Sequence, residues 1–297
     1  MKIGYADYLV LFLLALLWGS SFGMIKIGVN QVGPLTLVAG RIIFAAFILY
    51  AWMRLTTDQR LKLSPISLWH YWVVGLLGHS VPFALISWGE MFINSSTAAV
   101  LMGVMPIVTV MLAHFFLKDE PFKRLTLVGV CFGFSGLIVL VGVSTLQGLG
   151  QTIAGEAATV LAAISYASVT IFVRRNVHQS GIQIATGAMI LAAIASLAIA
   201  LIFESPMDYE WNSQTLFPII YLGVFPTAIA SLLYFKLVRK IGATNFSQVN
   251  YMIPLVGSGI GVMFMGEQPH LRMWIALCLI LTGITLVRAA QNNKASA

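Results

Sequence analysis

Residues 95–117 read SSTAAVLMGVMPIVTVMLAHFFL, an apolar run with a proline, Pro106, near its centre. The arrangement returns in residues 243–265, ATNFSQVNYMIPLVGSGIGVMFM, where Pro254 stands 148 positions after Pro106. Other identities share this gapless offset: Gly33 with Gly181, Gly75 with Gly223, Pro121 with Pro269, and Ser20 with Ser168. The second half of the chain therefore repeats the first, which predicts two units, residues 1–148 and 149–297.

The composition places both units in a membrane. The chain has 297 residues, of which 59% are hydrophobic and 9% are charged, and its mean hydropathy is +0.91. Soluble domains carry roughly 25% charged residues. Ten apolar stretches each approach the roughly 20 residues that a helix needs to cross a bilayer, and their continuity excludes the alternating strands of a membrane β-barrel. They are residues 7–26, 34–54, 70–90, 95–117, 125–143, 153–173, 182–203, 215–236, 244–265 and 271–288.

Charge in the short loops predicts the orientation of these spans. With ten spans and a cytoplasmic N-terminus, all 17 Lys and Arg residues except Lys26, Arg41 and Arg272 fall on the cytoplasmic side. Such a bias is the main sequence determinant of topology. The sequence thus predicts an all-α polytopic protein with both termini cytoplasmic. Its ten transmembrane helices form two inverted five-helix repeats, an arrangement typical of secondary transporters.

The N-terminus allows a second interpretation. Lys2 followed by an apolar run could be a secretory signal peptide, with the small residues Gly19 and Ser20 near a cleavage point. The run continues through Phe22 and Met24, however, and a matching apolar stretch opens the second repeat. We therefore expect an uncleaved first span.

Interior prolines indicate where helices are irregular. A proline leaves the carbonyl four residues earlier without its helical hydrogen bond, and that carbonyl must face protein or water rather than lipid. Pro82, Pro106, Pro226 and Pro254 all lie inside predicted spans. Pro106 and Pro254 occupy equivalent points of the repeats, so they are either kinks that shape packing or pivots of a gate around a central cavity.

Polar residues share faces of several predicted spans. His79 and Phe83 lie four residues apart on one face of the third span, and the 148-residue shift carries them to Thr227 and Ser231 in the eighth. Polar groups facing lipid are costly, so these faces should point inward, as contacts between helices or as the lining of a cavity. The predicted substrate-binding residues are Trp18, Ser21, His79, Tyr166, Tyr234, Gln248 and Tyr251.

Two ionisable residues lie at or within predicted spans. Arg41 stands seven residues after Pro34 in the second span, and Glu90 ends the third. Intramembrane charges are candidates for function. Arg41 could pair with Glu90 as a structural tie. Alternatively, Arg41 attracts an anionic group of a substrate while Glu90 or His79 exchanges a proton.

Several functional classes lack their sequence signals. The chain has no phosphate-binding P-loop, no HExxH, no GxSxG and no CxxC motif. We therefore expect no enzymatic activity, no cofactor, no metal site and no binding of nucleic acid.

Gly129 and Gly133 have the spacing of close helix contacts, which could serve packing within the chain or a homodimer.

Short motifs in order along the chain resemble the EamA branch of the drug/metabolite transporter superfamily. Residues 18–22 (WGSSF) are similar to the family's opening in the first span, and Arg41 in residues 40–44 (GRIIF) looks like its arginine in the second. Residues 90–106 are similar to its third-span exit and proline-bearing fourth span. Residues 265–269 (MGEQP) look like its glycine–glutamate span end, whereas the first copy has Lys118, Asp119 and Glu120 there.

The resemblance implies a ten-helix carrier of small metabolites or drugs in a bacterial inner membrane. It also implies alternating access around a cavity lined by spans one, three, four, six, eight and nine. We predict a secondary transporter or exporter of small organic metabolites, namely amino acids or similar amphipathic solutes, with its site between the repeats. A non-transporting subunit or receptor, and less favourably a membrane enzyme acting on lipid, are the alternatives.

Overall fold

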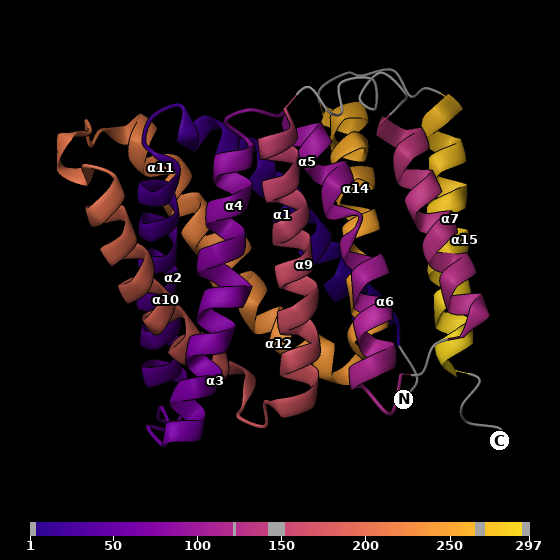
Figure 1. Cartoon of the computed structure of the whole chain (residues 1–297), viewed down its shortest axis with the longest axis horizontal. Helices are drawn as coiled ribbons and strands as arrows, with labels where there is room; N and C mark the ends of the chain where they lie inside the picture. Colours follow the sequence, from indigo (N-terminus) through magenta and orange to yellow (C-terminus); the bar gives the residue numbers. More distant parts are fainter. Residues whose placement is uncertain (1–3, 121–122, 142–151, 265–270, 293–297) are drawn as a thin grey trace.

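The structure is a computed structural model that describes residues 4–120, 123–141, 152–264 and 271–292, and within these ranges its regular elements are helices (Figure 1). The first repeat contains α1 (Tyr5–Val29), α2 (Pro34–Thr56), α3 (Pro65–Gly75), η1 (Leu76–Ser80), α4 (Val81–Gly89), α5 (Ser95–Met102), α6 (Met105–Phe116) and α7 (Arg124–Val141). The second contains α9 (Ile153–Asn176), α10 (Gly181–Phe203), η2 (Pro206–Asp208), α11 (Ser213–Leu222), η3 (Gly223–Ile229), α12 (Ala230–Ile241), α13 (Ala243–Ser247), α14 (Val249–Phe264) and α15 (Leu271–Asn292).

The described helices have the length and composition of membrane spans. Eight segments are long and apolar enough to cross a bilayer, and Arg124–Leu140 is a shorter apolar helix. Elements α3, η1 and α4 form one such segment, Pro65–Gly89, and α11, η3 and α12 form another, Ser213–Ile241. The predicted all-helical, multi-pass architecture is therefore confirmed. The predicted boundary between the repeats, after residue 148, lies outside the described residues.

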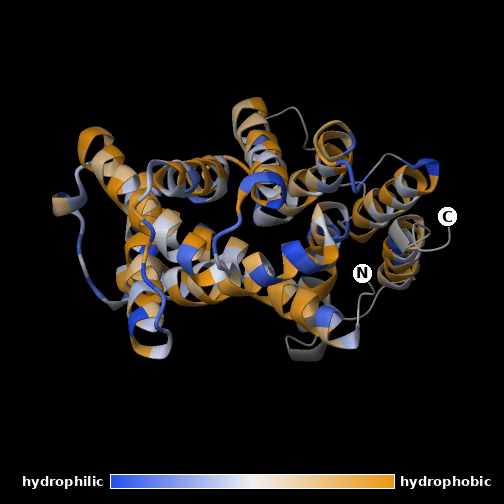
Figure 2. Cartoon of the chain, turned by 90° about the horizontal axis from the view of Figure 1, so that it is seen from below, coloured by the Kyte–Doolittle hydropathy of each residue, from blue (hydrophilic) through white to orange (hydrophobic). Residues whose placement is uncertain are grey.

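The outer surface of the bundle is apolar. Phe47, Phe115 and Phe203 each expose more than two thirds of their surface, at 72%, 76% and 74%. Figure 2 shows hydrophobic colouring on outward as well as inward helix faces. Soluble proteins rarely expose apolar surface on this scale. The bundle is thus suited to lipid around its circumference.

Two π-helical segments occupy equivalent places in the repeats. η1 precedes Pro82, and η3 contains Pro226. Residues 76 and 80 of η1 map onto 224 and 228 of η3 under the 148-residue shift. π-Bulges are uncommon and often mark functional sites. The widened turns place His79 and Pro226 on opposite repeats around the same central space.

Pro106 and Pro254 do not produce matching irregularities, contrary to what their repeat positions suggest. The fourth predicted span is interrupted at Gly103 and Val104, and Pro106 lies in the first turn of α6. Pro254 instead stands inside the continuous helix α14, and the interruption in that span falls at Gln248. A proline in a first helical turn gives up no helical hydrogen bond, which explains why Pro106 begins a helix.

Glycines allow close contacts between helices of different repeats. A Cβ atom added to Gly75 of α3 would lie 2.6 Å from the Ala188 carbonyl of α10. A Cβ atom added to Gly223, the repeat equivalent of Gly75, would lie 2.8 Å from the Arg41 carbonyl of α2. In each repeat a glycine thus packs against the helix backbone of the other repeat, so that α3 lies close to α10 and η3 lies close to α2.

The pair Gly129 and Gly133 packs inside the chain. Gly129 faces the backbone of Gly283 on α15, and Gly133 faces both Gly283 and the ring of Tyr251. Figure 1 shows α7 and α15 side by side at one end of the bundle. Of the two predicted uses of this glycine spacing, the structure supports packing within the chain.

Candidate functional site

A cavity lies between the repeats at the centre of the bundle. The volume that the centre of a water molecule can occupy in it is about 110 Å³. A single bound water needs roughly 10–15 Å³ of such volume. The space is therefore large enough for several waters or for part of a small solute. Its lining comprises Trp18, Ser21, Phe22, Ile25, Arg41, Val74, Gly78, His79, Phe83, Ile86, Met102, Met105, Tyr166, Val169, Thr170, Pro226, Ser231, Tyr234, Phe235, Phe246, Asn250 and Ile253.

The structure brings six of the eleven predicted site residues to this cavity. They are Trp18, Ser21, Arg41, His79, Tyr166 and Tyr234. The other five, Gln248, Tyr251, Glu90, Pro106 and Pro254, do not appear in its lining. The residues that meet come from α1, α2, η1, α9 and α12, so the two repeats contribute jointly.

Aromatic side chains form one wall of the cavity. The rings of Trp18 and Phe246 meet edge to face with centroids 6.0 Å apart, and Tyr234 meets Phe246 in the same way at 5.0 Å. Trp18 Nε1 donates a hydrogen bond to the Pro226 carbonyl at 3.1 Å, and the Tyr234 hydroxyl donates to Thr170 Oγ1 at 3.3 Å. These contacts tie α1 to η3 and α9 to α12 beside the cavity.

Arg41 is held by the irregular turn of η3. Its Nε and Nη2 atoms donate to Thr227 Oγ1 at 3.2 and 3.0 Å. The Thr227 hydroxyl in turn donates to the Leu222 carbonyl at 2.6 Å, the group to which Pro226, lacking an N–H, gives no α-helical hydrogen bond. The guanidinium also lies 3.8 Å from the centre of the Phe83 ring. Arg41 is 2% exposed, so a cation is fixed in the protein interior by neutral partners.

The structural tie between Arg41 and Glu90 does not form. Glu90 is fully buried, and its Oε2 accepts a hydrogen bond from Ser95 at 3.1 Å while Oε1 has no partner. Lys26 approaches the same turn but donates to the Glu90 carbonyl at 2.5 Å rather than to the carboxylate. Glu90 therefore belongs to a polar cluster at the ends of α1 and α4, apart from the cavity lining.

His79 presents an unsatisfied imidazole. Both ring nitrogens are buried and neither has a hydrogen-bond partner. The ring stands 5.6 Å from that of Phe83 and lines the cavity. Buried polar groups are almost always hydrogen-bonded, so an orphaned pair in a cavity wall indicates a group that a bound molecule or water would satisfy.

The predicted roles of Gln248 and Tyr251 are not supported by their positions. Gln248 Nε2 donates to the Thr244 carbonyl at 3.2 Å, and the Tyr251 hydroxyl donates to the Val130 carbonyl of α7 at 3.2 Å. The helix is interrupted at Gln248, so a helical face does not run unbroken from α13 into α14. Tyr251 consequently points at α7, where it packs between helices.

Sequence reasoning missed Phe246 and Asn250 as lining residues. Asn250 donates through Nδ2 to the Ser247 carbonyl at 3.1 Å and to Met105 Sδ at 3.0 Å. A polar amide in the middle of an apolar span was the available signal for Asn250. Phe246 carried none, because an aromatic residue in a membrane span is compatible with any orientation.

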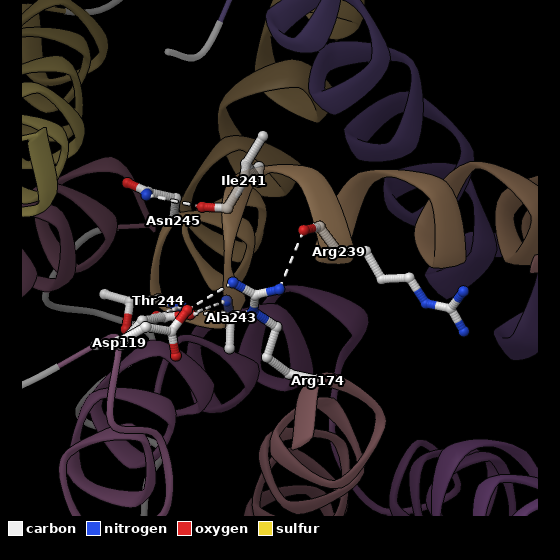
Figure 3. A network of polar contacts seen from close by, with 8 residues as sticks. Asp119, Arg174, Arg239, Ile241, Ala243, Thr244 and Asn245 are labelled. Atoms are coloured by element: carbon white, nitrogen blue, oxygen red, sulfur yellow. Dashed lines mark hydrogen bonds and ion pairs between the residues drawn. The ribbon is translucent and has the colours of Figure 1, made fainter. Parts of the chain in front are cut away.

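A second polar cluster lies at the end of the bundle where α6, α9 and α12 finish (Figure 3). Glu120 is buried, and its carboxylate accepts the backbone N–H groups of Ala243 and Thr244, both at 2.8 Å. Arg174 of α9 lies 2.7 Å from Asp119, 3.7 Å from Glu120, and donates to the Arg239 carbonyl at 3.1 Å. The cluster joins the first repeat to the start of α13.

No group of three or more His, Cys, Asp or Glu residues in the described ranges could hold a metal ion. The cavity thus offers an arginine, an imidazole, hydroxyls and an amide among aromatic walls.

Comparison with protein families decides the relationship of the chain. The model of the EamA-like transporter family matches residues 6–142 and again residues 153–289. The chain belongs to the EamA-like transporter family. The two matches also show that the family unit occurs twice in the chain, and they confirm the resemblance seen in the short motifs.

Two of three similar relatives of this family member are named transporters. The chain is 24% identical over 270 residues to the uncharacterized transporter YoaV of Bacillus subtilis, covering 91% of this chain and 92% of that protein. It is 26% identical over 283 residues to the uncharacterized inner membrane transporter YedA of Escherichia coli, covering 93% and 89%. Protein PagO of Salmonella typhimurium is 25% identical over 287 residues, covering 95% and 93%.

A solved crystal structure shares the fold of this EamA-like chain. The TM-score is 0.77 at 19% sequence identity, and the match covers 97% of this chain and 99% of the other. The family, the named relatives and the apolar helices identify a membrane transporter, and the predicted multi-pass placement in an inner membrane is confirmed. The names of YoaV and YedA describe transporters rather than enzymes.

Proposed function

We propose that this EamA-like protein is a secondary transporter that moves small amphipathic organic solutes, such as amino acids, across the membrane by alternating access. The observation that carries the proposal is the central cavity, to which both repeats contribute aromatic and polar side chains. Substrate sites of repeat-built carriers lie near the bilayer midplane between the repeats. A purely structural subunit has no comparable need for unsatisfied polar groups there.

The proposed topology is ten spans in two inverted five-helix repeats, with both termini cytoplasmic. The distribution of Lys and Arg in the loops supports it. Single cysteines placed at Lys62 and at Asp208, in a variant lacking Cys131 and Cys278, would test it by labelling intact cells. We expect a membrane-impermeant reagent to label the cysteine at position 208 and to spare that at position 62; the reverse pattern contradicts the topology.

Alternating access requires contacts that form and break around the cavity. Three contacts are candidates for this role. The Tyr234–Thr170 hydrogen bond and the Trp18–Phe246 contact would close the cavity on one side, and the Lys26–Glu90 cluster would close it on the other. We assign Arg41 and Glu90 to charge coupling, and Pro106 and Pro254 to the shape of the two helices that flank the cavity. The wider turns at η1 and η3 supply further points at which the helices can bend.

Transport by purified protein in proteoliposomes is the direct test. We expect saturable uptake of at least one solute from a panel of amino acids and related organic acids, amines and neutral compounds. His79→Ala should lower that uptake about tenfold, because the side chain lost is a buried polar group of the cavity wall. His178→Ala removes an exposed imidazole outside the cavity and should leave uptake unchanged.

The same assay separates the alternatives. Uptake that responds to an imposed pH gradient supports proton coupling, and uptake that ignores the gradient indicates facilitated transport. Absence of flux for every solute, combined with ligand-induced thermal stabilisation, favours a receptor. Undiminished flux in His79→Ala removes that residue from the site.

A further inference from the structure

The described residues that line the cavity carry a positive charge and no negative one. Arg41 is the one formally charged side chain among the described residues that line the cavity. In the described part of the chain, no carboxylate oxygen lies within 4.0 Å of its guanidinium; the ion pairs there involve Arg174 and Lys240. The Arg41 partners are the Thr227 hydroxyl and the Phe83 ring, both neutral.

An uncompensated buried cation is unfavourable. Removing a charge from water costs several kcal/mol, and neutral hydrogen bonds or a cation–π contact return only part of that cost. An arginine is charged at all physiological pH values, so loss of its proton does not relieve the cost. A bound anion would supply the missing partner, and the planar guanidinium suits a carboxylate in two-point contact.

A positively charged substrate group finds no equivalent partner. Glu90 is fully buried and does not line the cavity; its Oε2 accepts a hydrogen bond from Ser95, and its Oε1 has no partner. Glu120 and Glu204 are engaged by backbone N–H groups, of α13 and of α2 respectively, at 2.8–2.9 Å. An ammonium group in the cavity would therefore find no counter-ion among the described lining residues, and it would lie near the positive charge of Arg41.

The rest of the wall suits a ring. Trp18, Phe83, Tyr166 and Phe246 surround the space, and aromatic pairs of this kind favour stacked or edge-on contacts. His79 offers two unpartnered nitrogens on the same wall as Phe83, on whose ring Arg41 also lies. The polar groups of Arg41 and His79 therefore lie next to the aromatic surface of Phe83.

We infer that the transported solute is a net-negative organic acid, with its carboxylate on Arg41, a hydrogen bond to His79 and an uncharged aromatic body against the rings of Trp18 and Phe246. The inference rests on the proposed transport function and narrows it. It favours monocarboxylates over zwitterionic amino acids, and it predicts exclusion of organic cations, because these would place positive charge beside Arg41.

Three probes of matched shape test the charge preference. 3-Phenylpropanoate, phenylalanine and 2-phenylethylammonium share a phenyl ring and a short chain and differ in net charge. Binding to the purified protein is measured by isothermal titration, and transport by uptake into proteoliposomes. We expect the acid to bind at least about tenfold more tightly than phenylalanine, because its charge-assisted contact with Arg41 is not opposed by an ammonium group. We expect the amine not to bind.

Variants then assign the preference to Arg41. Arg41→Gln should weaken binding of the acid about tenfold or more, and Arg41→Lys should retain part of it. Arg54→Gln, which removes an exposed positive charge outside the cavity, should change nothing. The three-probe comparison in the unmodified protein keeps the test valid if the Arg41 variants fail to fold.

The outcomes distinguish this inference from the proposed function. Equal or tighter binding of phenylalanine or the amine, or no binding of the acid, overturns the inference. Transport of phenylalanine as fast as that of the acid, or any transport of the amine, would also overturn the inference but would leave the protein a transporter. Unchanged affinity for the acid in a folded Arg41→Gln protein would remove Arg41 as its partner.

Discussion

Replacing Glu120 with Ala is expected to destabilise the protein by about 3–5 kcal/mol, the range for removing one member of a buried charged contact. The carboxylate is 6% exposed and accepts the N–H groups of Ala243 and Thr244, which have no intrahelical partner at the start of α13. Its loss also leaves the adjacent Arg174 without a buried counter-charge. Thermal unfolding in detergent should show a clearly lower midpoint.

The neighbouring residue provides the matched control. Asp119 also pairs with Arg174, at 2.7 Å, but its side chain is 58% exposed. Exposed ion pairs contribute about 0–1 kcal/mol, so Asp119→Ala should lower the midpoint only slightly. Equal effects of the two substitutions would show that Glu120 does not stabilise the end of α13 as inferred.

Valine at Gly75 or at Gly223 is expected to be almost as disruptive, at about 3 kcal/mol or more each. The added atoms would enter the space of the Ala188 carbonyl in one case and the Arg41 carbonyl in the other, at 2.6 and 2.8 Å from Cβ. Backbone atoms of a packed helix cannot move aside as a flexible side chain can. α3 must therefore separate from α10, and η3 from α2. The thermal midpoint and the retained folded fraction measure the effect.

The same substitution at Gly23 serves as the control. This glycine of α1 is exposed, and a Cβ atom added to it would meet nothing within 4 Å. We expect Gly23→Val to change stability by no more than about 0.5 kcal/mol. A similar loss at all three positions would indicate a general intolerance of valine in these helices, and the inferred contacts between the repeats would then be wrong.

Much of the fold was accessible from hydropathy and the internal repeat. The predicted stretch 153–173 corresponds to α9 (Ile153–Asn176), and 34–54 corresponds to α2 (Pro34–Thr56). Long apolar runs report helices reliably because lipid leaves no other way to satisfy the backbone. Interruptions within the runs were less predictable. Pro226 lies in a π-helical turn, yet Pro254 lies in a regular helix, so a proline inside a span does not by itself specify the local geometry.

The candidate site was only partly predictable. Trp18, His79, Tyr166 and Tyr234 reach the cavity from polar or aromatic faces that the sequence displays. Gln248 and Tyr251 do not, because a helical face calculated across an interruption loses its register. The partner of Arg41 was also missed. Thr227 lies 186 residues away in sequence, and its hydroxyl is placed by a π-helical turn that no spacing rule describes.

By itself, the sequence determined that this is a helical membrane protein built from two related halves, because apolar length and repeat identity are properties of the chain alone. The tertiary structure decided which polar groups meet. The packing of η3 against α2 pairs Arg41 with the Thr227 hydroxyl, and the fold places His79 of η1 where both of its nitrogens are buried without a partner. The physical reason is that membrane composition specifies spans, whereas long-range packing specifies which buried charges go uncompensated.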